Sequence, residues 1–252
     1  MKTARIFKIF FSLQGEGPLL GTPMIFVRFR GCNLRCIWCD EPDALAMDSG
    51  IEMSLEKTLN EIIRLSPQQP PSANQQLPPW VSLTGGEPLL QFTFIKELAP
   101  ELKKRGFNIL LETNGALPEA LEAVAPWRDL ISMDIKLPSA HPFNDKETPE
   151  NRPSLTRWML ETNERFLSQA PEKSYAKIVV TQKTTSEELL NAFGLLSRHP
   201  STRLVVLQPA TPRDGIEPPD HDQLDRFHRL AWDHLPHPIR LMPQHHPYWK
   251  LP

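Results

Sequence analysis

The strongest constraint on the fold is an alternation of strand-like and helix-like segments through most of the chain. Short apolar segments rich in β-branched residues lie at residues 80–83, 107–111, 130–135, 175–180, 203–207 and 239–242. Segments with the apolar spacing of amphipathic helices separate them, at about 91–105, 118–124, 154–168, 186–197 and 220–234. Two earlier strands are expected at 4–10 and 22–30. Repeated strand–helix units predict an α/β fold with a mostly parallel sheet, either a full or partial barrel or a doubly wound layer.

Polar and glycine-rich segments follow these strands directly. In parallel α/β folds, ligands bind at the carboxyl ends of the strands, so these segments are expected to converge on one active-site mouth. The segments are residues 31–40, Thr84–Pro88, Glu112–Gly115, Asp134–Lys136, Gln208–Thr211 and Gln244–His246.

The composition is typical of a folded, soluble protein. Of the 252 residues, 40% are hydrophobic and 23% are charged. The formal net charge of −2 gives no electrostatic reason to expect a nucleic-acid partner. No apolar run approaches the roughly 18 residues of a membrane span, and the apolar N-terminus lacks the cleavage site of a secretory signal. We therefore expect a cytoplasmic protein without a membrane partner.

The chain is unusually rich in proline, with 27 residues, about twice the usual share. Many of them lie near residues 66–79, which predicts an extended surface insertion. A second long loop is expected near residues 138–153. We expect both to be excursions from a single domain that covers residues 1–252.

All three cysteines, Cys32, Cys36 and Cys39, lie within eight positions. This clustering favours one inorganic site over disulfide bonds. Three thiolates at this spacing can bind a 4Fe–4S cluster and leave its fourth iron open for another ligand. A zinc site completed by a histidine, and three unligated thiols, are the alternatives that the spacing leaves open.

The cysteine spacing, with Trp38 before the last cysteine, resembles the signature of the radical SAM superfamily. Residues 84–88, Thr-Gly-Gly-Glu-Pro, resemble its second signature, which binds the methionine amino group of the cofactor. The resemblance implies a modified partial (βα) TIM-like barrel of radical SAM type. It also implies that Cys32, Cys36 and Cys39 hold a 4Fe–4S cluster and that S-adenosyl-L-methionine, once reduced, supplies a 5′-deoxyadenosyl radical.

Three further segments narrow the resemblance. Residues 12–17 read Ser-Leu-Gln-Gly-Glu-Gly, residues 21–23 read Gly-Thr-Pro, and residues 26–28 read Phe-Val-Arg. With the tail from Gln244 to the terminal proline, they resemble the 7-carboxy-7-deazaguanine synthase (QueE) family. This implies a carbon–nitrogen lyase that contracts 6-carboxy-5,6,7,8-tetrahydropterin to 7-carboxy-7-deazaguanine with loss of ammonia, in queuosine or another deazapurine pathway.

The resemblance also assigns substrate contacts. A carboxylate such as Glu16 can accept hydrogen bonds from the guanidine-like edge of a pterin, and the guanidinium of Arg28 can bind the substrate carboxylate. Without the resemblance, Glu16 would be interpreted as an exposed charge in a turn and Arg28 as a solvated strand residue. The implied substrate-binding residues are Leu13, Gln14, Gly15, Glu16, Arg28, Thr84 and Pro252.

Contacts with S-adenosyl-L-methionine are implied around the cysteine loop and three strand ends. Asp134 could accept from the ribose hydroxyls and Lys136 could pair with the methionine carboxylate, although a simple salt bridge between the two would be the default interpretation. The implied cofactor-binding residues are Trp38, Cys39, Asp40, Gly86, Ser132, Asp134, Lys136, Gln208, Pro209, Ala210 and Thr211.

Glu41 departs from the family pattern. Family members usually carry a threonine at this position, and its hydroxyl helps to hold a Mg²⁺ ion. Glutamate is a good ligand for hard cations, but it is longer and adds negative charge. The sequence leaves open whether Glu41 binds Mg²⁺ or whether the metal requirement is altered or absent.

The resemblance further implies a homodimer and a flavodoxin-type electron donor. Two other functions remain compatible with the sequence. A radical SAM activase of a glycyl-radical enzyme would share the cysteine loop and the partial barrel. A non-catalytic zinc-binding scaffold would instead give a colourless protein after anaerobic purification.

Overall fold

The fold is built on one open sheet of nine strands. A computed structural model describes residues 2–48, 50–66, 78–140 and 152–250. The strands are β1 (Thr3–Leu13), β2 (Pro23–Phe29), β3 (Ile51–Ser54), β4 (Trp80–Gly85), β5 (Asn108–Thr113), β6 (Leu130–Asp134), β7 (Ser174–Val180), β8 (Val205–Pro209) and β9 (Ile239–Leu241). Their order is β3-β1-β2-β4-β5-β6-β7-β8-β9. Every pair from β2 to β9 is parallel, whereas β1 runs antiparallel to both β2 and β3.

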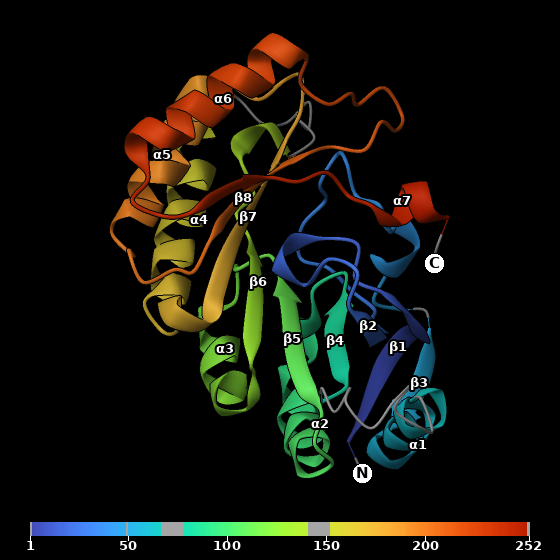
Figure 1. Cartoon of the computed structure of the whole chain (residues 1–252). Helices are drawn as coiled ribbons and strands as arrows, with labels where there is room; N and C mark the ends of the chain where they lie inside the picture. The colour runs from blue at the N-terminus through green and yellow to red at the C-terminus, as the bar shows by residue number, and fades with distance from the viewer. Residues whose placement is uncertain (1, 49, 67–77, 141–151, 251–252) are drawn as a thin grey trace.

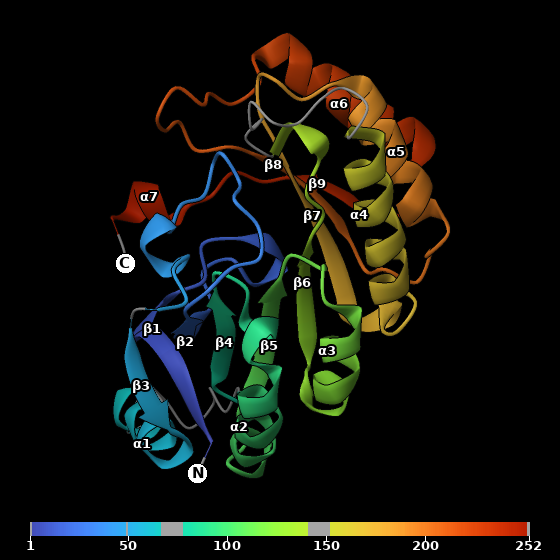
Figure 2. The ribbon, with the colours of Figure 1, turned by 180° about the vertical axis from the view of Figure 1, so that it is seen from behind.

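Helices cover the outer side of this sheet. They are α1 (Leu55–Leu65), α2 (Phe92–Lys104), α3 (Pro118–Val124), α4 (Arg152–Leu167), α5 (Ser186–Ser197), α6 (His221–His234) and α7 (His246–Trp249). Figures 1 and 2 show α1 to α6 following one another along the sheet, with α7 apart from them near the C-terminus. The predicted α/β architecture with a mostly parallel, partial barrel is confirmed. Within the described residues, no helix is long and apolar enough to cross a bilayer.

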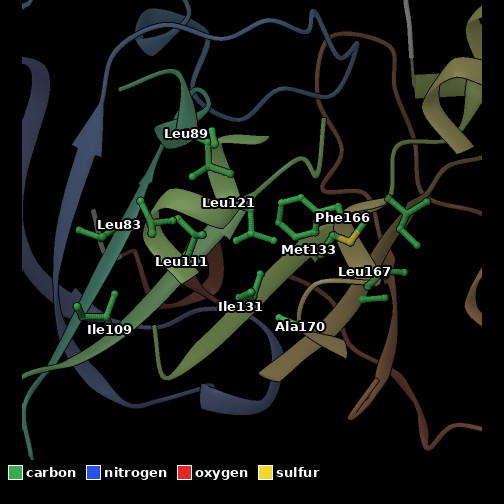
Figure 3. Packing of buried hydrophobic residues seen from close by; sticks show 14 of the residues in the cluster. Leu83, Leu89, Ile109, Leu111, Leu121, Ile131, Met133, Phe166, Leu167 and Ala170 are labelled. Atoms are coloured by element: carbon green, nitrogen blue, oxygen red, sulfur yellow. The ribbon is translucent and has the colours of Figure 1, made fainter. Parts of the chain in front are cut away.

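The main core lies between the sheet and the helices. Successive strand side chains point to opposite faces, so alternate apolar residues such as Leu83, Leu111 and Ile131 reach the helices. Figure 3 shows Leu121 of α3 among these side chains, with Phe166 of α4 nearby. This core fixes the strands from their outer face and leaves the inner face free for other chemistry.

The inner face changes from apolar to polar along the strands. A second, smaller cluster includes Phe26 of β2, Leu110 of β5 and Tyr175 of β7. Two residues further along the same strands, the period-two rule places polar side chains on this face. These are Arg28, Glu112 and Lys177. The carboxyl ends of the strands therefore present polar groups above an apolar floor.

Two features of the fold differ from the sequence-based prediction. The first strand runs from Thr3 to Leu13 rather than ending at residue 10, because it pairs with β2 as far as Pro23. The short strand β3 was not predicted, since its four residues are ordered by pairing with β1 rather than by their own pattern. Most of the predicted proline-rich insertion and of the 138–153 loop lies outside the described residues.

Leu121→Ala should lower the apparent melting temperature of the purified protein strongly. Its side chain is fully buried in the main core, and a Leu→Ala change at such a site costs about 2–5 kcal/mol, or about 5–15 °C for a protein of this size. Leu190→Ala is the matched control because Leu190 is 39% exposed on α5. Equal shifts for both variants, measured by thermal unfolding, would contradict the placement of the core.

Candidate active site

A cavity of about 500 Å³ lies at the carboxyl ends of the parallel strands, a size suited to small-molecule ligands. All but two of the residues assigned from the sequence line it. They are Leu13, Gln14, Gly15, Glu16, Arg28, Cys32, Cys36, Trp38, Cys39, Asp40, Glu41, Thr84, Gly86, Ser132, Asp134, Lys136, Gln208, Ala210 and Thr211. Pro209 does not line the cavity, because it lies between Gln208 and Ala210 on a strand whose side chains alternate. Pro252 lies outside the described residues.

The register of the sheet brings these residues together. Arg28 of β2 pairs with Thr84 of β4, so two residues assigned to the substrate are neighbours. Asp134 of β6 pairs with Lys177 of β7. Paired positions in a parallel sheet point to the same face, so each pair projects into the cavity side by side.

The cysteine loop is tied to several parts of the fold. The backbone N–H of Gly31 donates to the carbonyl of Ala44 at 2.8 Å, and that of Ile37 donates to the carbonyl of Ala140 at 2.8 Å. Nη1 of Arg213, in the loop after β8, donates to the carbonyls of Cys39 and Asp40 at 3.0 and 2.9 Å. Sequence reasoning missed Arg213, which lies in a polar loop without a recognisable pattern.

All three thiols are free and face the same cavity. Burial is the main cause that raises the pKa of Cys32, to about 11. Burial also raises the pKa of Cys36, and nearby Lys136 opposes this effect. Because thiolates are the metal-binding form, a bound metal must displace these protons.

The donor set fits an iron–sulfur cluster better than a single ion. Within the described ranges, no three His, Cys, Asp or Glu side chains are grouped closely enough to hold one metal ion. A cluster does not need such a group, because each cysteine binds a different iron. Three thiols along one cavity wall therefore suit a cluster with one iron left open.

The Thr84–Pro88 segment packs directly against the cysteine loop. A Cβ atom on Gly86 would overlap the carbonyl oxygen of Gly31 and the Cβ of Cys32, so only glycine permits this approach. The backbone N–H of Glu87 also donates to the Gly31 carbonyl at 2.7 Å. Gly86 is therefore required for packing against the cysteine loop, in addition to the cofactor contact that the resemblance implies.

The side chain of Glu87 links this segment to the end of β5. It is fully buried and accepts hydrogen bonds from the Leu89 N–H at 3.0 Å, the Thr113 hydroxyl at 2.8 Å and the Asn114 N–H at 2.8 Å. Burial raises the pKa of Glu87 to about 7, although the three hydrogen bonds act in the opposite direction.

Glu16 lies in a buried polar network rather than in solvent. It is 8% exposed and accepts from Lys177 Nζ at 2.6 Å and from Gln244 Nε2 at 2.6 Å. Its backbone N–H donates to Gln14 Oε1 at 3.1 Å, and Gln14 Nε2 donates to Glu112 Oε1 at 3.2 Å. The interpretation of Glu16 as an exposed charge is therefore wrong.

Arg28 forms an ion pair with Glu41 across the cavity wall. The two side chains are 19% and 29% exposed, and the guanidinium carbon of Arg28 lies 5.6 Å from the ring centroid of Phe10. The interpretation of Arg28 as a solvated strand residue is also wrong. The position where family members carry a threonine therefore holds the counter-ion of Arg28.

Several buried polar atoms at the cavity have no protein partner. Trp38 Nε1, Asp134 Oδ1 and Gln208 Oε1 have no hydrogen-bond partner among the described residues. Buried polar groups are nearly always satisfied, so such atoms in a cavity wall indicate a polar ligand. All three residues line the same cavity as the cysteine thiols, which fits S-adenosyl-L-methionine.

The C-terminal segment closes the cavity near the Gln14–Glu16 turn. The backbone N–H of His245 donates to the Gly15 carbonyl at 3.0 Å, and His246 packs against Gly15 so closely that a Cβ there would overlap it. His246 and Pro247 both line the cavity. Residues near the two ends of the described chain therefore meet at one site.

The largest omission of the sequence analysis is Lys177. It was missed because it lies inside a strand whose other residues suggested a fully buried core element. Its charge in the otherwise uncharged run 174–180 was the available signal. Buried charges are rare unless they are paired or functional.

Comparison with known proteins identifies the class. Residues 26–214 match the family model described as the Radical SAM superfamily, and the chain belongs to that superfamily. The chain is 34% identical over 257 residues to 7-carboxy-7-deazaguanine synthase of Methanopyrus kandleri, covering 96% of this chain and 91% of that protein. The protein with the same name in Methanocaldococcus jannaschii is 32% identical, covering 96% and 97%. The chain therefore belongs to the 7-carboxy-7-deazaguanine synthase family, as its motifs predicted.

The fold agrees with this assignment. The crystal structure of QueE from Escherichia coli superposes with a TM-score of 0.57, covering 95% of this chain and 94% of that chain at 20% identity. At this level of identity, the likeness shows a shared fold.

Glu87→Ala should destabilise the protein by about 3 kcal/mol or more, because it leaves three buried donors without an acceptor. Glu122→Ala, on the exposed side of α3, is the control and should change stability by about 0.5 kcal/mol or less. Chemical denaturation of both variants provides the measurement. A Glu87→Ala protein as stable as the control would show that this carboxylate does not hold the segment.

Proposed function

We propose that this chain converts 6-carboxy-5,6,7,8-tetrahydropterin to 7-carboxy-7-deazaguanine with loss of ammonia, as a radical SAM carbon–nitrogen lyase. One observation carries the proposal. The three cysteine thiols share a single cavity with a buried carboxylate, Glu16, and a guanidinium, Arg28. The cavity thus joins cluster ligands to groups of opposite charge suited to the two polar ends of a carboxypterin.

The cysteine side of the cavity would hold the cofactors. Cys32, Cys36 and Cys39 are the proposed ligands of the 4Fe–4S cluster, which together with S-adenosyl-L-methionine supplies a 5′-deoxyadenosyl radical when bound. The unpartnered oxygens of Asp134 and Gln208 would accept hydrogen bonds from the cofactor. Lys136, paired with Asp134 at 2.7 Å, supplies a cation for the methionine carboxylate.

The opposite side would hold the substrate. The carboxylate of Glu16 would accept hydrogen bonds from the amino and ring N–H groups of the pterin, and the backbone of Gln14 and Gly15 would lie along the same edge of the pterin. Arg28 would bind the substrate carboxylate in a bidentate manner, with Thr84 beside it in the sheet register. The protein thereby fixes the pterin between two charged groups, which limits its orientations to one.

We propose that Glu41 replaces the family threonine as a Mg²⁺ ligand. Its carboxylate is an oxygen donor of the kind that Mg²⁺ binds, and it lines the cavity. Moving from Arg28 to the metal would free the guanidinium for the substrate. This proposal links metal binding to substrate binding through a single ion pair.

The remaining partners are proposed from the family resemblance. We propose a homodimer, a flavodoxin-type electron donor, a cytoplasmic location and a single domain over residues 1–252. The joining of all nine described strands in one sheet supports the single domain, and the free thiols suit a reducing compartment.

Anaerobic reconstitution with iron and sulfide, followed by incubation with the pterin, S-adenosyl-L-methionine and a reductant, should yield a brown protein, 5′-deoxyadenosine and 7-carboxy-7-deazaguanine. Cys36→Ala should lose both the colour and the product, because only two of the three thiols remain. A colourless variant that still forms the product would contradict the proposal. Formation of 5′-deoxyadenosine by the wild type without any deazapurine would point to the activase function instead.

Removal of Mg²⁺ from the buffer should lower the turnover of the wild-type protein several-fold, because Arg28 then remains paired with Glu41. Glu41→Thr should depend on Mg²⁺ less than the wild type does, since threonine supplies an oxygen donor but no counter-ion for Arg28, whereas Glu41→Val should lose the dependence. Steady-state rates with and without the metal give the comparison. A wild-type steady-state rate that is the same with and without Mg²⁺ would rule out Glu41 as a ligand.

A further inference from the structure

Four side chains of alternating charge cross the cavity wall in a continuous chain. Lys177 Nζ lies 2.6 Å from a carboxylate oxygen of Glu16 and 3.3 Å from one of Asp134. Asp134 in turn lies 2.7 Å from Nζ of Lys136. The four side chains are only 11–13% exposed. Lys177 is therefore the cation that connects the substrate half of the cavity to the cofactor half.

We propose that Lys177 is a positioning residue shared by both halves of the site, where its ammonium is the common counter-ion that holds the carboxylates of Glu16 and Asp134 in place. The proposal rests on the function proposed above, in which Glu16 meets the pterin and Asp134 meets the cofactor. Lys177 donates a hydrogen bond to Glu16 at 2.6 Å and forms an ion pair with Asp134 at 3.3 Å, and these two residues are far apart in sequence. A neutral side chain at this position would leave Glu16 without its ion-pair partner and Asp134 with Lys136 alone.

The geometry explains why this position requires a cation. Asp134 and Lys177 are paired positions on neighbouring strands, so the main core holds their backbones at a fixed spacing. Glu16 reaches Lys177 from the turn after β1, and Gln244 donates to its other oxygen. Three separate segments of the chain thus converge on one buried ion-pair network.

The surroundings of Glu16 show what Lys177 contributes. Burial by itself would raise the pKa of Glu16, but the charge and hydrogen bond of Lys177 outweigh it and hold the pKa at about 2. Besides Lys177, the groups around Glu16 are the amide of Gln244, the imidazole of His246, Glu112, Tyr175, and Asp40, which accepts from the same Gln244 nitrogen at 3.2 Å. Glu112 opposes the charge of Glu16, and Gln244 carries none.

Replacing Lys177 with methionine should therefore make substrate binding depend on pH. Without the ammonium, burial raises the pKa of Glu16, so Glu16 takes up a proton as the pH falls. The protonated carboxyl accepts fewer hydrogen bonds from the guanidine-like edge of the pterin. Pterin affinity should then decrease toward acidic pH in the variant, whereas Glu16 stays ionised throughout this range in the wild type.

Equilibrium binding to the anaerobically reconstituted protein between pH 6 and 8.5 tests the proposal. Lys177→Met should weaken pterin binding at least tenfold at the acidic end and less at the basic end. It should weaken binding of S-adenosyl-L-methionine only a few-fold, because Asp134 keeps Lys136. Lys177→Arg should restore most of the affinity and remove the pH dependence. Lys183→Met, which removes an exposed lysine just after the same strand, is the control and should bind both ligands as the wild type does.

Three outcomes decide the proposal. A Lys177→Met protein whose pterin affinity has the pH dependence of the wild type would overturn it. If Lys177→Met does not fold, Glu16→Gln combined with Lys177→Met removes both charges, and its pterin affinity should be low but independent of pH, whereas an affinity equal to the wild type would overturn the proposal.

A failure of the proposed function gives a different result. If the wild type binds S-adenosyl-L-methionine but not the pterin, the substrate assignment fails. The binding of S-adenosyl-L-methionine to the same variants then still tests the role of Lys177. A weaker affinity for S-adenosyl-L-methionine in Lys177→Met, restored in Lys177→Arg, would retain the role toward Asp134. An unchanged affinity would reject it.

Discussion

The structure depends on parallel pairing of strands whose two faces carry different residues. On the outer face, alternate apolar side chains such as Leu111 and Ile131 join the helices in the main core. On the inner face, the strands end in polar groups that the register sets side by side. Because a one-residue slip would exchange the faces, burial of the outer face also fixes which residues reach the cavity. Stability and site geometry therefore share one cause.

The charged groups of the site are held by one another. Glu16, Lys177, Asp134 and Lys136 form a buried chain in which each charge has an opposite neighbour. Removing one member would leave the next as an uncompensated buried charge, which is strongly unfavourable. The ion pairs can therefore fix the positions of these four side chains before any ligand binds.

Sequence motifs were most informative where chemistry restricts the residue type. The three cysteines and Gly86 were identified because few residues can ligate a cluster or allow such close backbone contact. Strand and helix positions followed from apolar periodicity. Lys177 and Arg213 were missed because a single lysine in a strand, or an arginine in a loop, has many ordinary explanations. The short strand β3 was missed because its order comes from its partner β1.

The sequence alone determined the α/β class, the parallel sheet, the cysteine loop and the family, because each of these rests on local pattern or on a restricted residue type. Only the tertiary structure decided that Arg28 pairs with Glu41 and that Glu16 is buried against Lys177. These contacts join residues from separate strands and loops. Their distances depend on the register and curvature of the sheet, which no local stretch of sequence encodes.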